Sequence, residues 1–477
     1  MKLEHVALFP HADGAKPVDI VIANGLIAAI EPSPGDAAPR SLAMPALANA
    51  HDHGRGVSTT SFGGAGKPLE TWLLRIGAMP SVDPYLNAVA AFGHAARAGV
   101  GSLMMHQTRP QGPMSLIDEA RILARAAADV GVRVTLAIAM RDRNPLVYGP
   151  SEAVLDTMPA EARAVVAAQF LSAPPLSPQE HVARVEAVAA AVESPTFTVE
   201  FGPAGAQWCS DELLTAIAEA SANTGRRVHM HLLETKYQRA FADAAYPEGL
   251  LPHLDKLGLL TERLALAHCV YARPEELDAI ARAGAVIVTN ASSNLHLRSG
   301  IAPIGEAIRR GCRVAIGVDA SALDEDDDAL REMRLAHFLH GGWGFDSVIE
   351  REPFLEQTVA NGRFANGAPG AGALKVGAPA DILVLDLAKL DRDAIMPVAP
   401  VDLLFARATR AHVERLIVAG CEVFADGRLT GVDLDATDAA VREAYRAGMP
   451  GRAPFLKAWG PLEAGVAQFC RERLGCC

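Results

Sequence analysis

The sequence predicts an α/β protein with a (β/α)8 TIM-like barrel and a small β-sandwich domain built from both chain ends. Between about residues 41 and 320, eight short apolar runs rich in Val, Ile and Leu alternate with Ala-rich amphipathic stretches. This alternation is typical of βα units around a parallel sheet. The 477 residues also exceed the roughly 250 residues of a bare barrel, so we expect further structure to be appended to it.

The eight apolar runs supply the expected barrel strands. We expect them to end near residues 53, 107, 140, 203, 234, 270, 294 and 321, and in order they read SLAMPALANAHDH, GVGSLMMHQ, RVTLAIAM, TFTVEFGP, RRVHMHLLE, LALAHCV, AVIVTNASSN and RVAIGVDAS. Helix signals lie between them, since Ser177 and Glu180 have capping-box spacing, and Pro274 and Gly284 open and close another helix. Eight units predict a closed barrel, although the periodicity alone is also compatible with an open sheet.

The regions on either side of the barrel have strand, turn and strand character. VDIVIANGLIAAIEPS precedes it, and GALKVGAPADILVLDL and VERLIVAGCEVFADGRL follow it. We therefore expect four regions. They are the first part of the small β domain (1–45), the barrel (46–370), the second part of the small β domain (371–435) and a helical tail (436–477).

Composition limits the partners and the location. Lys and Arg total 44 against 56 Asp and Glu, which gives a net charge of -12 and disfavours a nucleic-acid partner. We expect neither an export signal nor a membrane span. The seven scattered cysteines fit a reducing cytosol, so we expect a cytoplasmic protein with a homodimer as the default assembly. The adjacent Cys476 and Cys477 are compatible with weak metal binding or with an exposed tail.

Histidines and acids gather where the predicted strands end, which is the face that carries the active site in barrels. His51 and His53 share a face of the first strand because side chains alternate, and His231, His268 and Asp319 end later strands. Three imidazoles and one carboxylate suit a borderline divalent ion such as zinc or ferrous iron and leave a position for water. A lone His-x-His pair would be weak evidence for a metal site. Here, further histidines and an aspartate end other predicted strands. His229 lies one layer deeper, so we interpret it as a hydrogen-bonded histidine of the barrel.

The order of these motifs resembles the amidohydrolase superfamily, in the branch of cytosine deaminase, guanine deaminase, S-adenosylhomocysteine deaminase and the triazine hydrolases. The resemblance extends over nearly the whole chain. It rests on MPALANAHDH, LETWL, VHMHLLET, LAHCV, SSNLHLRSGIAPI, GVDAS and GALKVGAPADILVLD.

The resemblance implies a role for each site residue. It makes the metal ligands His51, His53, His231 and Asp319, makes Glu234 the proton shuttle, and gives His268 a contact to water or substrate. A carboxylate three residues after a ligand can reach water near the metal without ligating, and Asp319 can also accept a proton. The alternative for Glu234 is an exposed residue at a helix start.

The expected metal count is one. Members of the superfamily with two metals carry a carboxylated lysine on the fourth strand, and TFTVEFGP contains no lysine. Glu200 on that strand must be paired, protonated or functional, because an unpaired buried charge is costly. A structural hydrogen bond is the preferred interpretation, and a bridge to a second metal is the alternative.

The substrate contacts are not transferable from the resemblance. Many deaminases of this branch carry Pro-His-Ala after the fourth strand, where this chain has Pro203-Ala204-Gly205. Pocket candidates are chosen by their position after predicted strands and in the first long loop. They are Trp72, His106, Arg109, Gln207, Trp208, Asn294 and His296, with loop packing or surface pairing as the alternative.

The predicted function is hydrolytic deamination of a cyclic amidine or aminated heterocycle, a small-molecule substrate, with release of ammonia. The same residues would serve addition of water at any sp² carbon. Hydrolysis of a cyclic amide, urea or substituted triazine, of amidase or N-dealkylase type, is therefore the alternative. A non-catalytic metal-binding barrel is a more remote alternative, which the complete ligand set and Glu234 disfavour.

Overall fold

The computed structural model describes residues 1–10, 16–35, 37–108, 110–172, 174–320, 324–368 and 372–475. Arg109, Cys476 and Cys477 lie outside the described residues, so what the sequence suggests for them stays a prediction. Within the described ranges, no helix is long and apolar enough to cross a membrane.

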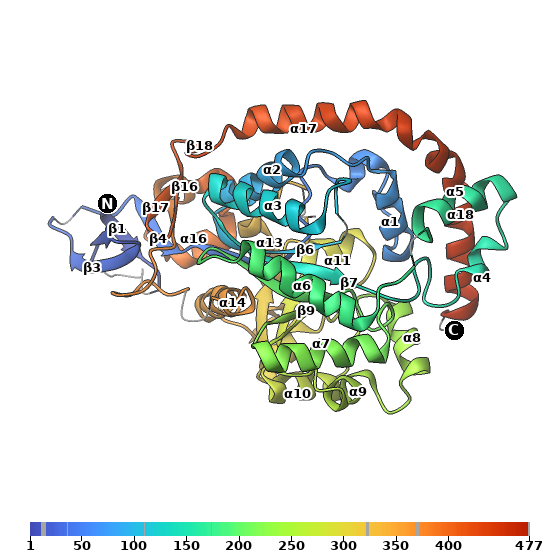
Figure 1. Cartoon of the computed structure of the whole chain (residues 1–477). Coiled ribbons are helices and arrows are strands. Elements are labelled where there is room, and N and C mark those ends of the chain that lie inside the picture. Colours follow the sequence, from blue (N-terminus) through green and yellow to red (C-terminus); the bar gives the residue numbers. More distant parts are fainter. Residues whose placement is uncertain are drawn as a thin grey trace.

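A sheet of eight parallel strands forms the centre of the molecule, and neighbouring strands follow one another in chain order (Figure 1). The first and last strands approach each other, because the Asp319 N–H donates to the His51 carbonyl at 2.9 Å and the Val318 N–H donates to the Asn49 side chain at 2.9 Å. The predicted barrel is therefore confirmed. Its strands are β5 (Leu47–Asp52), β6 (Val100–Gln107), β7 (Arg133–Met140), β8 (Phe197–Pro203), β9 (Val228–Leu232), β10 (Leu264–His268), β11 (Val286–Thr289) and β12 (Arg313–Ile316).

Helices cover the outside of the barrel, and β5, β6 and β10 are accordingly buried at every position. The covering helices are α2 (Pro84–Arg97), α3 (Leu116–Val130), α6 (Pro178–Val192), α7 (Asp211–Thr224), α9 (Leu250–Lys256), α10 (Pro274–Ala283), α12 (Ile304–Arg309) and α14 (Arg351–Ala365). Two predicted helix signals are confirmed. Ser177 and Glu180 form the capping box of α6, and Gly284 ends α10 in the left-handed conformation.

Further elements are inserted between the strands and these helices. They are η1 (Thr59–Phe62), α1 (Leu69–Arg75), η2 (Ile76–Ala78), α4 (Glu152–Leu155), α5 (Ala160–Phe170), α8 (Lys236–Ala245), α11 (Ala291–His296), α13 (Ala329–His340), β13 (Gly342–Trp343) and β14 (Asp346–Ser347).

The two chain ends together form the separate β domain, as predicted, seen at the left of Figure 1. Its strands belong to one hydrogen-bonded sheet in the order β18-β17-β16-β15-β4-β1-β2-β3. The sheet rolls onto itself, because Ile27 at the start of the edge strand β3 exchanges backbone hydrogen bonds with Gly377 and Ala378, just before β15. The strands are β1 (Lys2–Leu8), β2 (Val18–Ala23), β3 (Leu26–Pro32), β4 (Ser41–Pro45), β15 (Ile382–Asp386), β16 (Val413–Val418), β17 (Cys421–Ala425) and β18 (Arg428–Leu429).

The end of the chain is helical and returns to the barrel. In Figure 1, α17 (Leu434–Gly448) crosses the top of the view over α2, and α18 (Ala453–Arg473) descends beside α5 and α4. Trp459 and Phe469 of α18 share an apolar cluster with Leu74 of α1 and Leu155 of α4. The C-terminal helix therefore supports the elements around the barrel mouth. The remaining helices are α15 (Leu387–Leu390), α16 (Pro400–Arg407), η3 (Arg410–His412) and η4 (Met449–Arg452).

Several strands end earlier than the sequence suggested. The observed β9 ends at Leu232 and β12 at Ile316, whereas we expected ends near 234 and 321. Asp319 therefore lies in the loop after its strand. Its φ of +56° and the φ of +76° at His268 are in the left-handed region, which non-glycine residues adopt mainly where the surrounding structure enforces it.

Candidate metal centre

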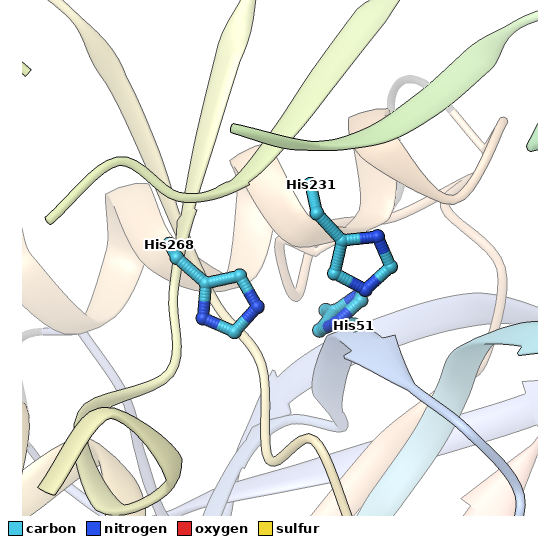
Figure 2. A group of neighbouring side chains, drawn as sticks. All are labelled: His51, His231 and His268. Carbon is cyan, nitrogen blue, oxygen red and sulfur yellow. The ribbon is translucent and has the colours of Figure 1, made fainter. Parts of the chain in front are cut away.

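Four histidines and one aspartate meet at the carboxyl end of the barrel strands. His51 and His53 come from the end of β5, His231 from β9, His268 from the end of β10, and Asp319 from the loop after β12. Figure 2 shows the His231 and His51 rings pointing toward one another, with His268 beside them. Side chains of the group were predicted to converge, because carboxyl ends of parallel strands share one edge.

The Nδ1 atoms of three of these histidines are already engaged. His53 Nδ1 lies 2.9 Å from the His106 carbonyl, and His231 Nδ1 lies 2.9 Å from the Ala204 carbonyl. A carbonyl can only accept, so both Nδ1 atoms carry the proton and both Nε2 atoms present a lone pair. His51 Nδ1 lies 2.9 Å from His229 Nε2, with the two rings stacked 5° from parallel. This partner fixes the His51 ring as second-shell groups do for metal-ligating imidazoles.

The free Nε2 atoms converge on one carboxylate oxygen. Asp319 Oδ1 lies 3.4 Å from His51 Nε2 and 3.2 Å from His53 Nε2. His231 Nε2 and His53 Nε2 are 3.5 Å apart, so two lone pairs face each other. Among the described residues, the buried atoms His51 Nε2 and Asp319 Oδ1 have no hydrogen-bond partner. The three Nε2 atoms and Asp319 Oδ1 each present a lone pair, and no hydrogen lies between them to form hydrogen bonds. Such a group of atoms fits a cation, so these residues fit the metal that the sequence predicted.

Asp319 is held in place by its neighbours. Ser293 Oγ donates to Asp319 Oδ2 at 2.5 Å, and this leaves Oδ1 to face the histidines. Burial alone would raise the pKa of Asp319, but contacts with His51 and His53 outweigh it and hold the pKa well below its usual value. Asp319 is therefore an anion in a cluster of imidazoles. Burial lowers the pKa of His51 and His231, which keeps both as neutral ligands.

Glu234 lies beside this cluster in the turn between β9 and α8. Its Oε2 atom is 3.7 Å from His268 Nε2, its Oε1 atom is 3.5 Å from Ser299 Oγ, and its side chain is buried. Burial first, and then the charges of Asp319 and Glu70, raise the pKa of Glu234 well above its usual value. The carboxyl group consequently keeps a proton that it can donate. The sequence alternative of an exposed helix-start residue does not match this burial.

His268 is oriented by α11. Its Nδ1 atom lies 2.9 Å from Asn294 Oδ1, which leaves Nε2 directed toward Glu234. Burial lowers the pKa of His268 to about 4, so the ring is neutral at pH 7. A neutral ring with Nδ1 protonated presents an acceptor at Nε2, suited to the proton of Glu234 or of a water molecule.

A cavity of about 610 Å³, including space open to solvent, lies over the cluster. Its lining combines polar groups of the cluster with aromatic and aliphatic side chains. Its lining consists of His53, Arg55, Leu69, Trp72, Leu73, His106, Thr108, Ala139, Arg141, Ala204, Trp208, His231, Glu234, His268, Leu297 and Asp319.

The predicted pocket residues divide into two groups. Trp72, His106 and Trp208 line the cavity. Gln207, Asn294 and His296 are not among its lining residues. Gln207 is buried against Gly205, Asn294 acts through His268, and His296 is half-buried at the end of α11.

Sequence reasoning missed the two arginines of the cavity, Arg55 and Arg141. Both follow the end of a barrel strand within three residues, which is the signal that selected Arg109. Ser293 was also missed as a contact of Asp319, although it belongs to the quoted SSNLHLRSGIAPI motif. Ser293 lies on α11, four residues after the end of β11, within the run AVIVTNASSN that was assigned to the seventh strand.

Glu200 is separate from the cluster. It lies on β8 with Oε1 3.8 Å from Arg227 Nε, and neither carboxyl oxygen has a hydrogen-bond partner among the described residues. The preferred structural hydrogen bond of the sequence interpretation is thus not present there. Burial raises the pKa of Glu200 to about 7, so the residue is protonated in part at neutral pH.

Glu200→Gln should stabilise the protein at alkaline pH and change it little at acid pH. The folded carboxyl binds its proton up to about pH 7, whereas the unfolded one releases it near 4.5, so wild-type stability is lost as pH rises through this range. The amide removes the free-energy cost of burying the ionised carboxylate, which is at most about 3 kcal/mol. Urea unfolding at pH 5 and pH 8 measures it, with the exposed Glu212→Gln as control. The same stability difference at both pH values would contradict the assignment.

Comparisons with known proteins agree with this architecture. The model of the amidohydrolase family matches residues 42–423. A 5-methylthioadenosine/S-adenosylhomocysteine deaminase of Nitratidesulfovibrio vulgaris (strain DP4) is 31% identical over 409 residues, which are 85% of this chain and 84% of that protein. Further deaminases align over 52–59% of their own length.

Two solved structures share the fold. An atrazine chlorohydrolase variant from Arthrobacter aurescens TC1, complexed with zinc and atraton, has a TM-score of 0.76 at 20% identity and covers 93% of this chain and 99% of its own. An adenosine deaminase from Xanthomonas campestris with bound zinc has a TM-score of 0.74 at 23% identity and covers 91% and 94%.

Proposed function

Because the chain belongs to the amidohydrolase family, we propose that it deaminates a cyclic amidine or amino-substituted heterocycle by hydrolysis and releases ammonia. The observation that carries the proposal is the position of Glu234. A carboxyl group with a raised pKa lies beside His268 and over the histidine and aspartate cluster, where a proton is needed for a leaving amine.

We propose one metal ion, zinc with ferrous iron as the alternative, held by His51, His53, His231 and Asp319. When bound, such an ion supplies Lewis acidity that acidifies water. Two observations favour a single ion. Glu200 faces Arg227 instead of the cluster, and β8 contains no lysine.

The residues of this chain divide the remaining work. Asp319 is an anion next to the place where water must be deprotonated, so it can take the first proton. Glu234 holds its proton in a buried site and can deliver it to a ring nitrogen or to the departing amine. His268 Nε2 orients the group that exchanges this proton with Glu234. The Asn294 side chain fixes the His268 ring.

The cavity walls suit a flat ring. Trp72 and Trp208 present aromatic surfaces, and Leu69, Leu73 and Leu297 exclude water around them. We propose Trp72, His106 and Trp208 as substrate contacts. Arg109, Gln207 and His296 stay predictions, Gln207 and His296 without a place in the cavity lining. The deaminase names of the relatives favour an aminopurine ring over other heterocycles.

One observation favours the second candidate, hydrolysis of a substituted triazine or cyclic amide. Ala204 lines the cavity where the deaminase pattern of the sequence resemblance has a histidine, so one polar contact to a purine is missing.

A substrate panel tests the function. Metal-loaded protein incubated with aminopurine nucleosides, cytosine, pterins, triazines and hydantoins should release ammonia from at least one amino heterocycle. Ammonia and the hydrolysed ring are quantified together. Ring opening, or release of an alkylamine without ammonia, would favour the second candidate over deamination. No hydrolysis of any compound in the panel would reject both candidates.

A further inference from the structure

One buried carboxyl group near the cavity has no part in the hydrolysis described above. Glu70 belongs to α1, and three other residues of this helix, Leu69, Trp72 and Leu73, line the cavity. Glu70 itself is only 9% exposed and is not among the lining residues. Burial raises the pKa of Glu70, which favours the neutral acid. Burying a carboxyl group costs free energy unless partners bind it, so the partners of Glu70 indicate what it does.

Two hydroxyl groups donate to the same oxygen of Glu70. Thr235 Oγ1 lies 2.5 Å from Glu70 Oε1, and the Tyr148 hydroxyl lies 3.1 Å from it. The other oxygen, Oε2, is buried without a hydrogen-bond partner among the described residues. Glu70 Oε1 therefore acts as the acceptor for both hydroxyl groups, and Oε2 is the place for the proton of the neutral acid.

The Thr235 hydroxyl connects Glu70 to the turn that carries Glu234. Thr235 Oγ1 accepts from the Gln238 N–H at 3.2 Å, and Gln238 Oε1 accepts from the Glu234 N–H at 2.9 Å. Leu233, just before this turn, has a φ of +49°, in the left-handed region that the surrounding structure must enforce. Three hydrogen bonds in series, the Glu70 anchor, thus join α1 to the backbone of Glu234.

The Tyr148 hydroxyl connects the same carboxyl group to a second part of the cavity wall. Tyr148 lies between β7 and α4, and its ring packs edge-on against Trp208 with the centroids 5.6 Å apart. Trp208 lines the cavity, as does Trp72, which follows Glu70 by two residues on α1. Glu70 therefore lies where two tryptophan-bearing segments meet the turn of Glu234.

We propose that Glu70 is a positioning residue, which holds Glu234 in register with a substrate ring bound against the tryptophans of the cavity. The inference rests on the proposed function, because Glu234 is the residue that delivers the proton there. Glu70 acts through the Thr235 hydroxyl and does not touch the reacting atoms. Since α1 both contributes to the cavity wall and anchors the acid, the alignment for proton transfer is set before substrate binds.

Amide hydrogen exchange tests the Glu70 anchor without any substrate. Glu70→Leu removes the acceptor of the Thr235 hydroxyl, whereas Glu70→Gln keeps an oxygen in place of Oε1. Exchange is measured by mass spectrometry on the metal-loaded protein, in a peptide that contains the Glu234 and Gln238 amides. It should be about threefold to tenfold faster in Glu70→Leu, the range for loss of one hydrogen bond, and close to wild type in Glu70→Gln. The exposed Glu152→Gln on α4 is the matched control.

Kinetics tests whether the anchor serves catalysis. With the panel compound that the wild type deaminates fastest, Glu70→Leu should lower kcat about tenfold to hundredfold, because a small displacement of the acid is costly. KM and metal content should stay nearly unchanged, since the cavity tryptophans and the proposed ligands remain. Glu70→Gln should recover most of the loss.

Substitutions of the partner residue make the assignment specific. Thr235→Val should lower kcat to a comparable extent, and Thr235→Ser, which keeps the hydroxyl, should recover it. In the double variant with Glu70→Leu and Thr235→Val the two losses should not multiply, because both substitutions remove the same hydrogen bond. The Thr235 variants carry the test if Glu70→Leu fails to fold.

The two measurements separate this inference from the function on which it rests. Wild-type exchange in Glu70→Leu would overturn the anchor, and faster exchange with wild-type kcat would overturn its part in catalysis. Equal losses in Glu70→Leu and Glu70→Gln would assign the effect to the acid group instead of the hydrogen bond, and would likewise overturn the anchor. If the wild type deaminates no compound of the panel while exchange changes as expected, the proposed function fails and the anchor stands.

Discussion

Glu234→Gln should lower kcat by about a hundredfold to ten-thousandfold, the usual contribution of a positioned acid or base. The glutamine amide keeps the shape of the side chain. The backbone N–H of residue 234, which donates to Gln238 Oε1 at 2.9 Å, is unchanged. It cannot carry a proton, however, and Glu234 is the buried group proposed to donate one to the leaving amine. The interaction develops in the transition state, so the loss should fall on kcat with KM nearly unchanged.

The measurement for Glu234→Gln combines steady-state kinetics with elemental analysis on the same preparation. Metal content should equal that of the wild type, since Glu234 is not assigned as a ligand. The exposed Glu275→Gln at the start of α10 is the control and should keep wild-type kinetics. A Glu234→Gln enzyme within a fewfold of wild-type kcat would remove Glu234 from the mechanism, whatever the metal content.

His51→Ala should lose both the metal and the activity. His51 contributes a fully buried Nε2 atom with no other partner, so its removal leaves two imidazoles and one carboxylate. We expect metal affinity to fall by more than the roughly 10- to 100-fold typical of substitutions in the second shell. Metal competition with a chromophoric chelator measures the change.

A graded series makes the His51 prediction specific. His229→Asn removes only the ring that orients His51 Nδ1, so its loss of affinity should lie within about 10- to 100-fold. The exposed Glu275→Gln on α10 is the control and should leave the metal affinity unchanged. If His51→Ala retains the wild-type stoichiometry while His229→Asn loses it, the assignment of ligand and supporting residue is reversed.

The convergence of the proposed metal ligands was predictable because strand periodicity determines the directions of their side chains. Alternation along β5 places His51 and His53 on one face, and parallel strands place their carboxyl ends at one edge. The same reasoning placed His229 one layer below, where the structure has it stacked on His51. The barrel and the β domain from both chain ends followed from equally regular patterns.

Loop residues were less predictable, because a loop has no period that aims its side chains. Gln207 and His296 were chosen for their positions after strands, and Gln207 also for its amide group, but neither is among the residues that line the cavity. Arg55 and Arg141 satisfied the same rule and do line it. Asp319 was expected on its strand, but a left-handed backbone three residues beyond β12 brings its carboxylate to the histidines.

The most direct test of the metal centre is anomalous diffraction from crystals of the wild-type protein, recorded on both sides of the zinc and iron absorption edges. The account predicts one peak per chain at one of these edges, within bonding distance of His51 Nε2, His53 Nε2, His231 Nε2 and an oxygen of Asp319. A chain without a peak at this cluster, or with a second peak beside Glu200, would contradict it.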